Sequence, residues 1–385
     1  MSQITPITWD DPLRLIDQLD EDERMVQRTA HDYCQDKLLP RVLEANRHEH
    51  FDREIMNEMG ELGLLGATLD GYGGSGLNYV SYGLIAREVE RVDSGYRSAM
   101  SVQSSLVMFP IYTFGSEDVR QKYLPKLASG EWVGCFGLTE PDHGSDPGSM
   151  STKAKKVDGG YVLNGAKNWI TNSPIADVCV VWAKLDGRIR GFLVDKDTHG
   201  YSTTKQEKKF SLRASTTSEL HFQDCRIPKD NLLPGADGLG GPLSCLTQAR
   251  YGIAWGAIGS AMACFETARE YSVTRIQFEK PIGSFQLVQL KLAEMLSEIT
   301  KGQLLNHRLS QLKDSGKMTP QHVSLAKRNN INIPFKNIND VKKAYNFSNL
   351  DSFLKIYYEG AKVLIKEQDF FDLTWAYALK CKEDN

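Results

Sequence analysis

The stretch Phe136-Gly-Leu-Thr-Glu-Pro-Asp-His-Gly-Ser145 decides how the rest of the chain is interpreted. It follows the apolar run Trp132-Val-Gly-Cys135 and leads into Asp146-Pro-Gly148, so that three glycines and two prolines leave little room for regular structure. Two hydroxyls and several backbone amides remain to face a ligand. The stretch therefore predicts a cradle for an anionic ligand or a ligand with many acceptor atoms. The alternative is a polar surface loop between a helical and a strand-rich region.

A second stretch, Asn164-Gly-Ala-Lys-Asn-Trp-Ile-Thr-Asn-Ser173, adds an aromatic ring and a hydroxyl. On a strand, Trp169 and Thr171 would share one face, because side chains alternate with a period of two. A flat aromatic beside a hydroxyl donor suits a flat heteroaromatic cofactor. The alternative is a cross-strand tryptophan in a β-barrel.

Composition narrows the class of protein. The chain has 385 residues, enough for two or three domains, and its net charge of −3 gives no general attraction to nucleic acid or to an anionic membrane. Its seven cysteines form no CxxC, which argues against structural zinc or a disulfide framework and fits a reducing compartment. No apolar run approaches transmembrane length. Asp10, Asp11, Asp17 and Asp20 make the N-terminus unlike a signal or transit peptide, so we expect a cytoplasmic protein of bacterial type.

The hydrophobic pattern changes along the chain and predicts an α+β fold. Residues 11–130 have helical periodicity, and period-two strands follow at Val178–Trp182, Gly191–Val194 and Leu220–Gln223. Asp158-Gly-Gly160 reads as a hairpin turn. Helical periodicity returns over 241–313, where an apolar bundle seam is formed by Val288, Leu292, Met295 and Ile299. We expect an N-terminal helical domain (1–131), a middle β-barrel domain (132–239), a C-terminal helical bundle (240–330) and a further helical tail (331–385).

Two short motifs are interpreted as structural. Gly71-Tyr-Gly-Gly-Ser-Gly76 matches GxGxxG, but helical patterns surround it, so a loop between helices is expected rather than a dinucleotide site. His48-Glu-His50 lies among Arg47, Asp52 and Arg53 and is expected to be a solvated turn. No metal site is predicted.

Together, the stretches 136–145 and 164–173 resemble the flavin site of the acyl-CoA dehydrogenases, and the resemblance runs from about Ile7 to Asn330. Arg97-Ser-Ala-Met-Ser101, preceded by Asp93-Ser-Gly-Tyr96, narrows it to the glutaryl-CoA dehydrogenase branch. The resemblance implies FAD as cofactor and oxidation with decarboxylation of glutaryl-CoA to crotonyl-CoA. It also implies an electron-transfer flavoprotein as acceptor, a homo-oligomer (a tetramer in the family), and a place in fatty acid and amino acid catabolism, including lysine degradation.

The resemblance also implies site residues. Those that bind FAD would be Phe136, Gly137, Leu138, Thr139, Glu140, Gly144, Ser145, Trp169, Ile170, Thr171, Arg275 and Gln286. Those that bind the substrate would be Arg97, Ser98, Ser145, Leu243, Leu246, Gln248 and Arg250. Arg97 and Ser98 would hold the far carboxylate of the substrate; the alternative for a buried Arg97 is an ion pair with Glu90. Arg275 and Gln286 would reach the FAD of a neighbouring subunit; the alternative for both is an exposed turn.

The resemblance changes near Lys327-Arg-Asn-Asn330. Residues 331–385, and at its loosest 318–385, resemble a fragment of an adenosine/adenine deaminase, as in Glu367-Gln-Asp-Phe-Phe-Asp-Leu-Thr-Trp-Ala-Tyr377. That part lacks the metal-binding His-x-His strand, so it implies no deaminase chemistry. The Tyr-Glu-Gly-Thr phrase that carries the family's catalytic Glu is absent.

The catalytic base is therefore left without a candidate. Tyr358-Glu-Gly360 imitates the missing phrase but lies in the deaminase-like part, and we do not expect Glu359 to act as the base. Two functions stay open: an FAD-dependent acyl-CoA dehydrogenase of impaired activity, or an inactive fusion of a truncated dehydrogenase and a truncated deaminase.

Overall fold

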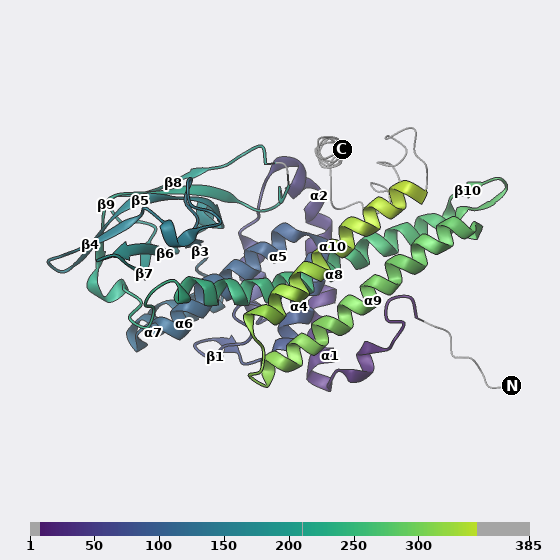
Figure 1. Cartoon of the computed structure of the whole chain (residues 1–385), viewed down its shortest axis with the longest axis horizontal. Helices are drawn as coiled ribbons and strands as arrows, with labels where there is room; N and C mark the ends of the chain where they lie inside the picture. The colour runs from purple at the N-terminus through teal and green to yellow at the C-terminus, as the bar shows by residue number, and fades with distance from the viewer. Residues whose placement is uncertain (1–7, 210, 345–385) are drawn as a thin grey trace. The chain divides into compact units, whose positions relative to one another are not determined.

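The computed structural model describes residues 8–209 and 211–344, with side chains to Ile333, and the chain divides into two compact units. Among the described residues, the first unit consists of 8–47, 79–94 and 250–344, and the second of 48–78 and 95–249 without residue 210. The predicted chain order of helices, then strands, then helices is confirmed (Figure 1). The four-part division at residues 131, 239 and 330 remains a prediction.

Helices make up the first unit. Its elements are η1 (Leu15–Gln18), α1 (Glu21–Tyr33), η2 (Cys34–Leu38), α2 (Leu39–His48), α4 (Tyr79–Val92), most of α8 (Gly240–Thr274), the hairpin β10 (Ile276–Gln277) and β11 (Lys280–Pro281), η7 (Ile282–Ser284), α9 (Gln286–Asp314) and α10 (Pro320–Ala344). The predicted bundle seam is confirmed, because Val288, Met295 and Ile299 are buried along α9 and Leu292 is partly buried.

The second unit combines helices with a sheet. Its helical part consists of α3 (Glu54–Glu61), the hairpin β1 (Asp70–Gly71) and β2 (Gly74–Ser75), α5 (Ser94–Ser101), the π-helical η3 (Val102–Met108), α6 (Phe109–Phe114) and α7 (Glu117–Ala128). The expected connection between two helices is confirmed at Gly71–Gly76, and it carries a small hairpin.

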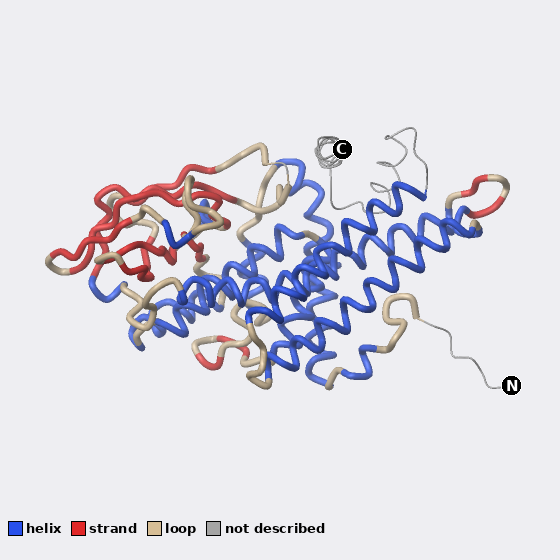
Figure 2. Tube along the Cα trace, viewed as in Figure 1, coloured by secondary structure: helices blue, strands red, loops and turns tan. Residues whose placement is uncertain are grey.

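Apart from the β1–β2 hairpin, the described strands of the second unit form one curled sheet of seven strands, which Figure 2 draws in red like the other strands. They are β3 (Gly134–Gly137), β4 (Lys153–Val157), β5 (Gly160–Thr171), β6 (Val178–Leu185), β7 (Arg188–Asp195), β8 (Tyr201–Lys205) and β9 (Thr217–Pro228), with the short turns η4 (Pro147–Ser149), η5 (Ser173–Ile175) and η6 (Lys229–Asn231) between them. The pairing order is β3-β6-β4-β5-β9-β8, and β7 pairs with β6. All three predicted strands and the turn at Asp158 are confirmed.

Strand β6 is buried on both faces, which explains its unbroken apolar run. Val178, Val180 and Trp182 pack into a cluster with helices α6 and α7, through Ile111, Tyr123 and Leu124 among others. The alternate residues Cys179 and Val181 pack into a second cluster inside the curl of the sheet. The strand therefore joins two separate apolar cores, and its neighbour β3, which pairs with it in parallel, leads straight into the predicted cradle.

Helix α10 runs without interruption through the point where the resemblance changes. Asn330 is fully buried, and its Nδ2 donates to Ala254 O at 3.0 Å and to Asn306 Oδ1 at 2.8 Å, so it ties α10 to α8 and α9. Three residues later, Ile333 is buried in the same apolar cluster as Ile258 and Met295. The first turn beyond Asn330 is thus still packed as part of the bundle.

We expect Asn330→Ala to lower the free energy of unfolding by about 1–3 kcal/mol, because it leaves the buried Asn306 Oδ1 without its donor. Ala254 O loses one donor but keeps the hydrogen bond from Asn306 Nδ2 at 3.0 Å. Urea unfolding followed by circular dichroism measures the change. Asn332→Ala, on an exposed position of the same helix, is the control and should stay within about 0.5 kcal/mol of the parent. Equal losses in both variants would contradict the assigned role of Asn330.

Candidate cofactor-binding site

Lys167 connects the two stretches 136–145 and 164–173. Its side chain lies in β5 and is fully buried, and its Nζ donates to Leu138 O at 3.0 Å and to Glu140 Oε1 at 2.9 Å. The next residue, Asn168, donates its backbone N–H to Thr139 O at 2.9 Å. The segment Leu138–Ser145, hereafter the cradle loop, is therefore fastened along the strand that carries Trp169 and Thr171.

Glu140 anchors the cradle loop from within. Its carboxylate accepts hydrogen bonds from Ser151 N at 2.6 Å, Ser151 Oγ at 2.8 Å and Thr152 N at 2.9 Å, in addition to the Lys167 ammonium. Burial alone would raise the pKa of Glu140, but hydrogen bonds from Thr152 and Ser151 and the charge of Lys167 lower it to about 2. Burial lowers the pKa of Lys167, and Glu140 opposes that change. The carboxylate is fully engaged within the protein, so any contact of Glu140 with FAD would come from its backbone.

The outer part of the cradle loop is a tight turn with exposed polar groups. Glu140 and His143 exchange backbone hydrogen bonds of 3.2 and 3.3 Å, and Gly144 and Ser145 beyond them are exposed. Within the described parts of the chain, the hydroxyls of Thr139 and Ser145 form no hydrogen bond. They are available to a ligand.

Trp169 is an exposed aromatic held in an unusual conformation. Its side chain is 64% exposed and its φ is 61°, at a register irregularity between Lys167 and Ile170. A left-handed backbone is costly for a bulky residue and persists where neighbouring structure imposes it, often beside a ligand site. Regular strand alternation, on which the shared face of Trp169 and Thr171 was predicted, is therefore interrupted here. Thr171 is half-buried, and among the described residues its hydroxyl has no partner.

The remaining residues predicted to bind FAD belong to the wall beneath this surface. Phe136, Leu138 and Ile170 are buried in the two apolar cores, so only their backbone atoms could meet a ligand. A Cβ on Gly137 would lie 3.2 Å from Lys167 Cγ, so the close approach of this strand to the lysine favours glycine. Unpaired hydroxyls, an exposed indole and a glycine-lined wall fit a flat cofactor with many acceptor atoms, as FAD is.

The residues predicted to hold the far carboxylate lie on α5. Arg97 is buried, as predicted, and Ser98 is half-buried. The alternative partner of Arg97, Glu90, accepts a hydrogen bond from Ser94 Oγ at 2.9 Å. Arg97 already interacts within the protein, and its five N–H donors could in addition bind a substrate carboxylate.

The other predicted ligand residues are divided between the two units. Leu243, Leu246 and Gln248 lie along α8 in the second unit, partly or fully accessible. Arg250, Arg275 and Gln286 belong to the first unit. Arg275 and Gln286 flank the β10–β11 hairpin and are exposed, as the exposed-turn alternative requires, and their contact with a neighbouring FAD stays a prediction.

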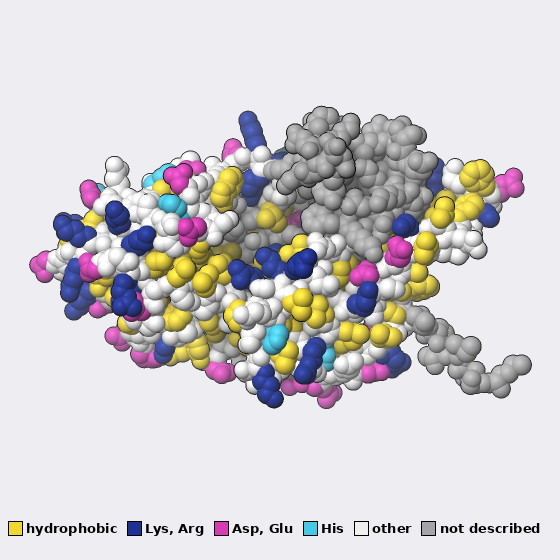
Figure 3. Space-filling model, in the orientation of Figure 1, with side chains coloured by type: hydrophobic (Ala, Val, Ile, Leu, Met, Phe, Trp, Pro, Cys, Tyr) yellow, Lys and Arg dark blue, Asp and Glu magenta, His cyan; other side chains and the backbone are white. Residues whose placement is uncertain are grey.

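The motif His48-Glu-His50 is a turn with both histidines exposed, but Glu49 is not simply solvated, because it forms a 2.5 Å ion pair with Arg213. In the described ranges, no cluster of three His, Cys, Asp or Glu side chains could hold a metal ion. No described helix is both long enough and apolar enough to span a membrane. Basic and acidic side chains are intermixed on the face drawn in Figure 3.

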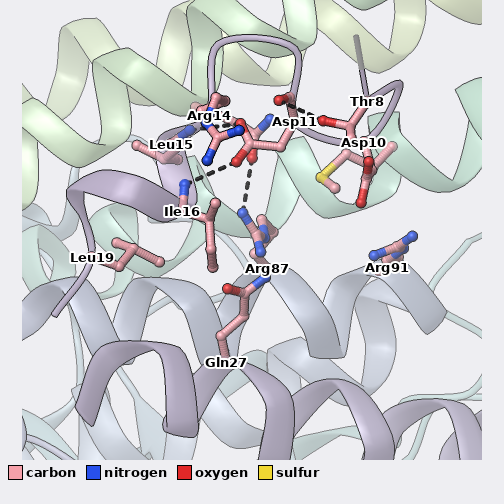
Figure 4. A pocket seen from close by; sticks show the side chains of 12 residues that line it. Thr8, Asp10, Asp11, Arg14, Leu15, Ile16, Leu19, Gln27, Arg87 and Arg91 are labelled. Atoms are coloured by element: carbon pink, nitrogen blue, oxygen red, sulfur yellow. Dashed lines mark hydrogen bonds between the residues drawn. The ribbon is translucent and has the colours of Figure 1, made fainter. Parts of the chain in front are cut away.

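A cavity of about 290 Å³ in the first unit contains none of the predicted ligand residues (Figure 4). Its lining includes Arg87, Arg91 and Gln303, and both arginines form ion pairs within the protein. Glu88, fully buried, accepts from Arg87 Nη2 at 2.7 Å and contacts His31 Nδ1 at 3.1 Å. Burial would raise the pKa of Glu88, but Arg87, His31 and Arg91 together lower it to about 2. This network is a structural core of ion pairs.

Family comparisons cover nearly the whole chain. Family models described as acyl-CoA dehydrogenase N-terminal, middle and C-terminal domains match residues 20–131, 135–225 and 236–332. A family model described as adenosine deaminase matches residues 311–385, so the two resemblances overlap on α9 and α10.

Individual proteins give the same assignment. The mouse mitochondrial short-chain specific acyl-CoA dehydrogenase is 37% identical over 318 residues, which cover 80% of this chain and 77% of the relative. A crystal structure of glutaryl-CoA dehydrogenase from Mycobacterium smegmatis is 44% identical, with a TM-score of 0.85, covering 92% of this chain and 95% of that chain. A glutaryl-CoA dehydrogenase from the same organism in complex with FADH2 is 42% identical, with a TM-score of 0.85, covering 96% and 97%.

We expect Lys167→Met to lower the free energy of unfolding by about 3–5 kcal/mol, because it leaves the Glu140 carboxylate buried without its cation. The double variant Lys167→Met/Glu140→Gln should lose less, since no uncompensated charge remains. Urea unfolding measures both, and Lys155→Met on an exposed position of β4 is the control, expected within about 0.5 kcal/mol. If the double variant loses as much free energy of unfolding as Lys167→Met, the pairing of Lys167 with Glu140 is contradicted.

The contribution of His31 should depend on pH. The hydrogen bond to Glu88 raises the pKa of His31 above its usual 6.5, so the stabilisation is complete below pH 6.5 and is lost as pH rises through the raised folded-state pKa. His31→Gln should therefore destabilise the protein more at pH 6 than at pH 9, by unfolding titrations at both values. A difference between parent and variant that grows with pH would reject this assignment.

Proposed function

The chain belongs to the acyl-CoA dehydrogenase family, and we propose that it binds FAD together with an acyl-CoA thioester, of which glutaryl-CoA is the preferred substrate. The observation that carries this proposal is the fastening of the cradle loop to the Trp169–Thr171 strand by Lys167. It brings together the free hydroxyls and the exposed indole that a flavin requires.

Different groups of the site would make different contacts with FAD. The hydroxyls of Thr139, Ser145 and Thr171 and the backbone of the cradle loop would donate to acceptor atoms of FAD, while Trp169 covers an apolar face of the ring system. FAD, when bound, supplies the acceptor for the hydride that leaves the substrate. A Cβ at Gly137 would lie 3.2 Å from Lys167 Cγ and 3.3 Å from Leu220 Cδ1, so a larger residue would disturb the strand that leads into the loop.

Arg97 and Ser98 would choose the substrate. A planar guanidinium binds a carboxylate through two parallel hydrogen bonds, and a lysine cannot reproduce that geometry. A monocarboxylic acyl-CoA offers no anion to that position. Relatives include both glutaryl-CoA and short-chain enzymes, so the preference for glutaryl-CoA rests on this buried arginine.

We expect the rate of catalytic turnover to be low, because a catalytic base is missing. Oxidation of a Cα–Cβ bond requires a base for the α-proton, and the family's Glu phrase has no counterpart in this sequence. Glu359 lies outside the described residues. We propose that the chain binds its ligands and oxidises glutaryl-CoA far more slowly than an intact enzyme. An electron-transfer flavoprotein as acceptor, a homo-oligomer with Arg275 and Gln286 at the neighbouring FAD, and a cytoplasmic role in lysine degradation belong to the same proposal.

A second candidate is an inactive fusion of a truncated dehydrogenase and a truncated deaminase. The match of residues 311–385 to the deaminase family favours it. A yellow, monodisperse protein that holds FAD would count against it, and a colourless aggregate would count in its favour.

The test is a titration of the FAD-loaded protein with glutaryl-CoA and with butyryl-CoA, followed by the change in flavin absorption. Arg97→Met should weaken glutaryl-CoA binding by about 100-fold, the value of a lost charge-assisted hydrogen-bond pair, and leave butyryl-CoA binding within about threefold. Turnover with a dye acceptor, measured alongside, should be far below that of an intact glutaryl-CoA dehydrogenase. Turnover equal to that enzyme would overturn the argument about the missing base.

A further inference from the structure

Asn172 sits where the cofactor strand ends. It follows Thr171 directly, is only 1% exposed, and has a left-handed backbone with φ 69°. Its backbone N–H donates to Thr216 O at 3.0 Å, which continues the pairing of β5 with β9. The side chain is therefore held at one place and points into the protein.

The side-chain amide of Asn172 connects two other segments of the second unit. Its Nδ2 donates to Ala99 O at 3.1 Å and to Gly134 O at 3.4 Å. Ala99 lies on α5, next to Arg97 and Ser98, and Gly134 is the first residue of β3, which leads into the cradle loop. One amide group thus touches all three segments that carry the second unit's predicted FAD residues and its carboxylate clamp.

The carbonyl of Ala99 is a natural target for such a donor. Helix α5 ends at Ser101 and continues at once into the π-helical segment Val102–Met108. A change of winding disturbs the regular pairing of carbonyls with N–H groups one turn ahead, and π-helical turns are common at functional sites. The donor from Asn172 fixes the helix at this irregular point.

One feature of Asn172 is unfavourable for stability alone. Its Oδ1 is buried with no hydrogen-bond partner in the part of the chain that the structure describes. Its positive φ is a conformation that asparagine adopts more readily than most other residues. Costly local features such as an unpaired buried oxygen persist where surrounding structure imposes them for a functional geometry.

We propose that Asn172 is a positioning residue that locks the cofactor strand to the substrate-binding helix α5, so that FAD and the substrate carboxylate are held in one register. The inference rests on the proposed function and deepens it. It assigns to Asn172 no contact with either ligand. Its effect passes through Thr171 on one side and through Arg97 and Ser98 on the other.

Three variants separate the parts of this role. Asn172→Gly removes the amide and keeps the backbone conformation, since glycine accepts positive φ readily. Asn172→Asp keeps the shape and the backbone preference but replaces the donating NH2 with an acceptor. Asn231→Ala is the matched control, because Asn231 is also buried in the second unit and donates Nδ2 to a backbone carbonyl, Leu193 O, at 3.0 Å, away from the predicted ligand residues.

The first readout uses the FAD-loaded protein. Asn172→Gly and Asn172→Asp should each weaken FAD binding by about tenfold, and should lower the preference for glutaryl-CoA over butyryl-CoA by about tenfold, the value of one buried hydrogen bond. Asn231→Ala should lose thermal stability and change neither quantity. A glutaryl-to-butyryl ratio in Asn172→Gly equal to that of the parent overturns the inference, as does an equal change in Asn231→Ala.

The second readout does not require FAD, and it separates this inference from the proposed function. Amide hydrogen exchange on the protein as purified should rise together in residues 97–101 and 168–172 of both Asn172 variants, and in neither segment of Asn231→Ala. Faster exchange in only one of the two segments contradicts the proposal that Asn172 holds them together. A parent protein that binds no FAD refutes the proposed function, and the exchange data still decide whether Asn172 joins the two segments.

Discussion

The buried pair of Lys167 and Glu140 is the interaction on which the candidate site depends. Neither charge could be buried without the other, and each is surrounded by hydrogen-bond partners that complete its shell. Because the ammonium also donates a hydrogen bond to Leu138 O, the pair fixes backbone as well as side chains. The cradle loop would otherwise be a glycine- and proline-rich segment with few restraints of its own.

The sheet beneath the loop supplies the rigidity that this pair needs. Strand β6 is packed into two apolar cores at once, and β3 is paired to it in parallel. A loop that leaves a doubly buried strand begins from a fixed point, whereas its far side at Gly144 and Ser145 is open. The exposed polar groups of the cradle loop are therefore carried by a sheet that apolar packing holds in place.

The hydrophobic pattern of the sequence predicted the helices and strands, but it did not predict the contacts between segments that lie far apart in the sequence. The strand at Val178–Trp182 and the seam of α9 were predicted correctly. The burial of one face of a strand or helix places apolar residues at regular intervals in the sequence, and this spacing can be recognised. The partnership of Lys167 with Glu140 was missed, because the two lie 27 residues apart and meet only through the register of β5 against the cradle loop. A lysine inside a buried strand was the one available hint. The bulge at Trp169 was missed for the same reason, since register irregularities depend on the partner strand.

The uninterrupted course of α10 has a consequence for insertions and deletions near Asn330. Because successive residues of a helix are related by a fixed rotation, the face that each residue after Asn330 occupies is set by the residues before it. Here that rotation brings an isoleucine, Ile333, inward. Insertion or deletion of a single codon between these two positions would turn everything downstream by about 100° and present a different side chain to the bundle.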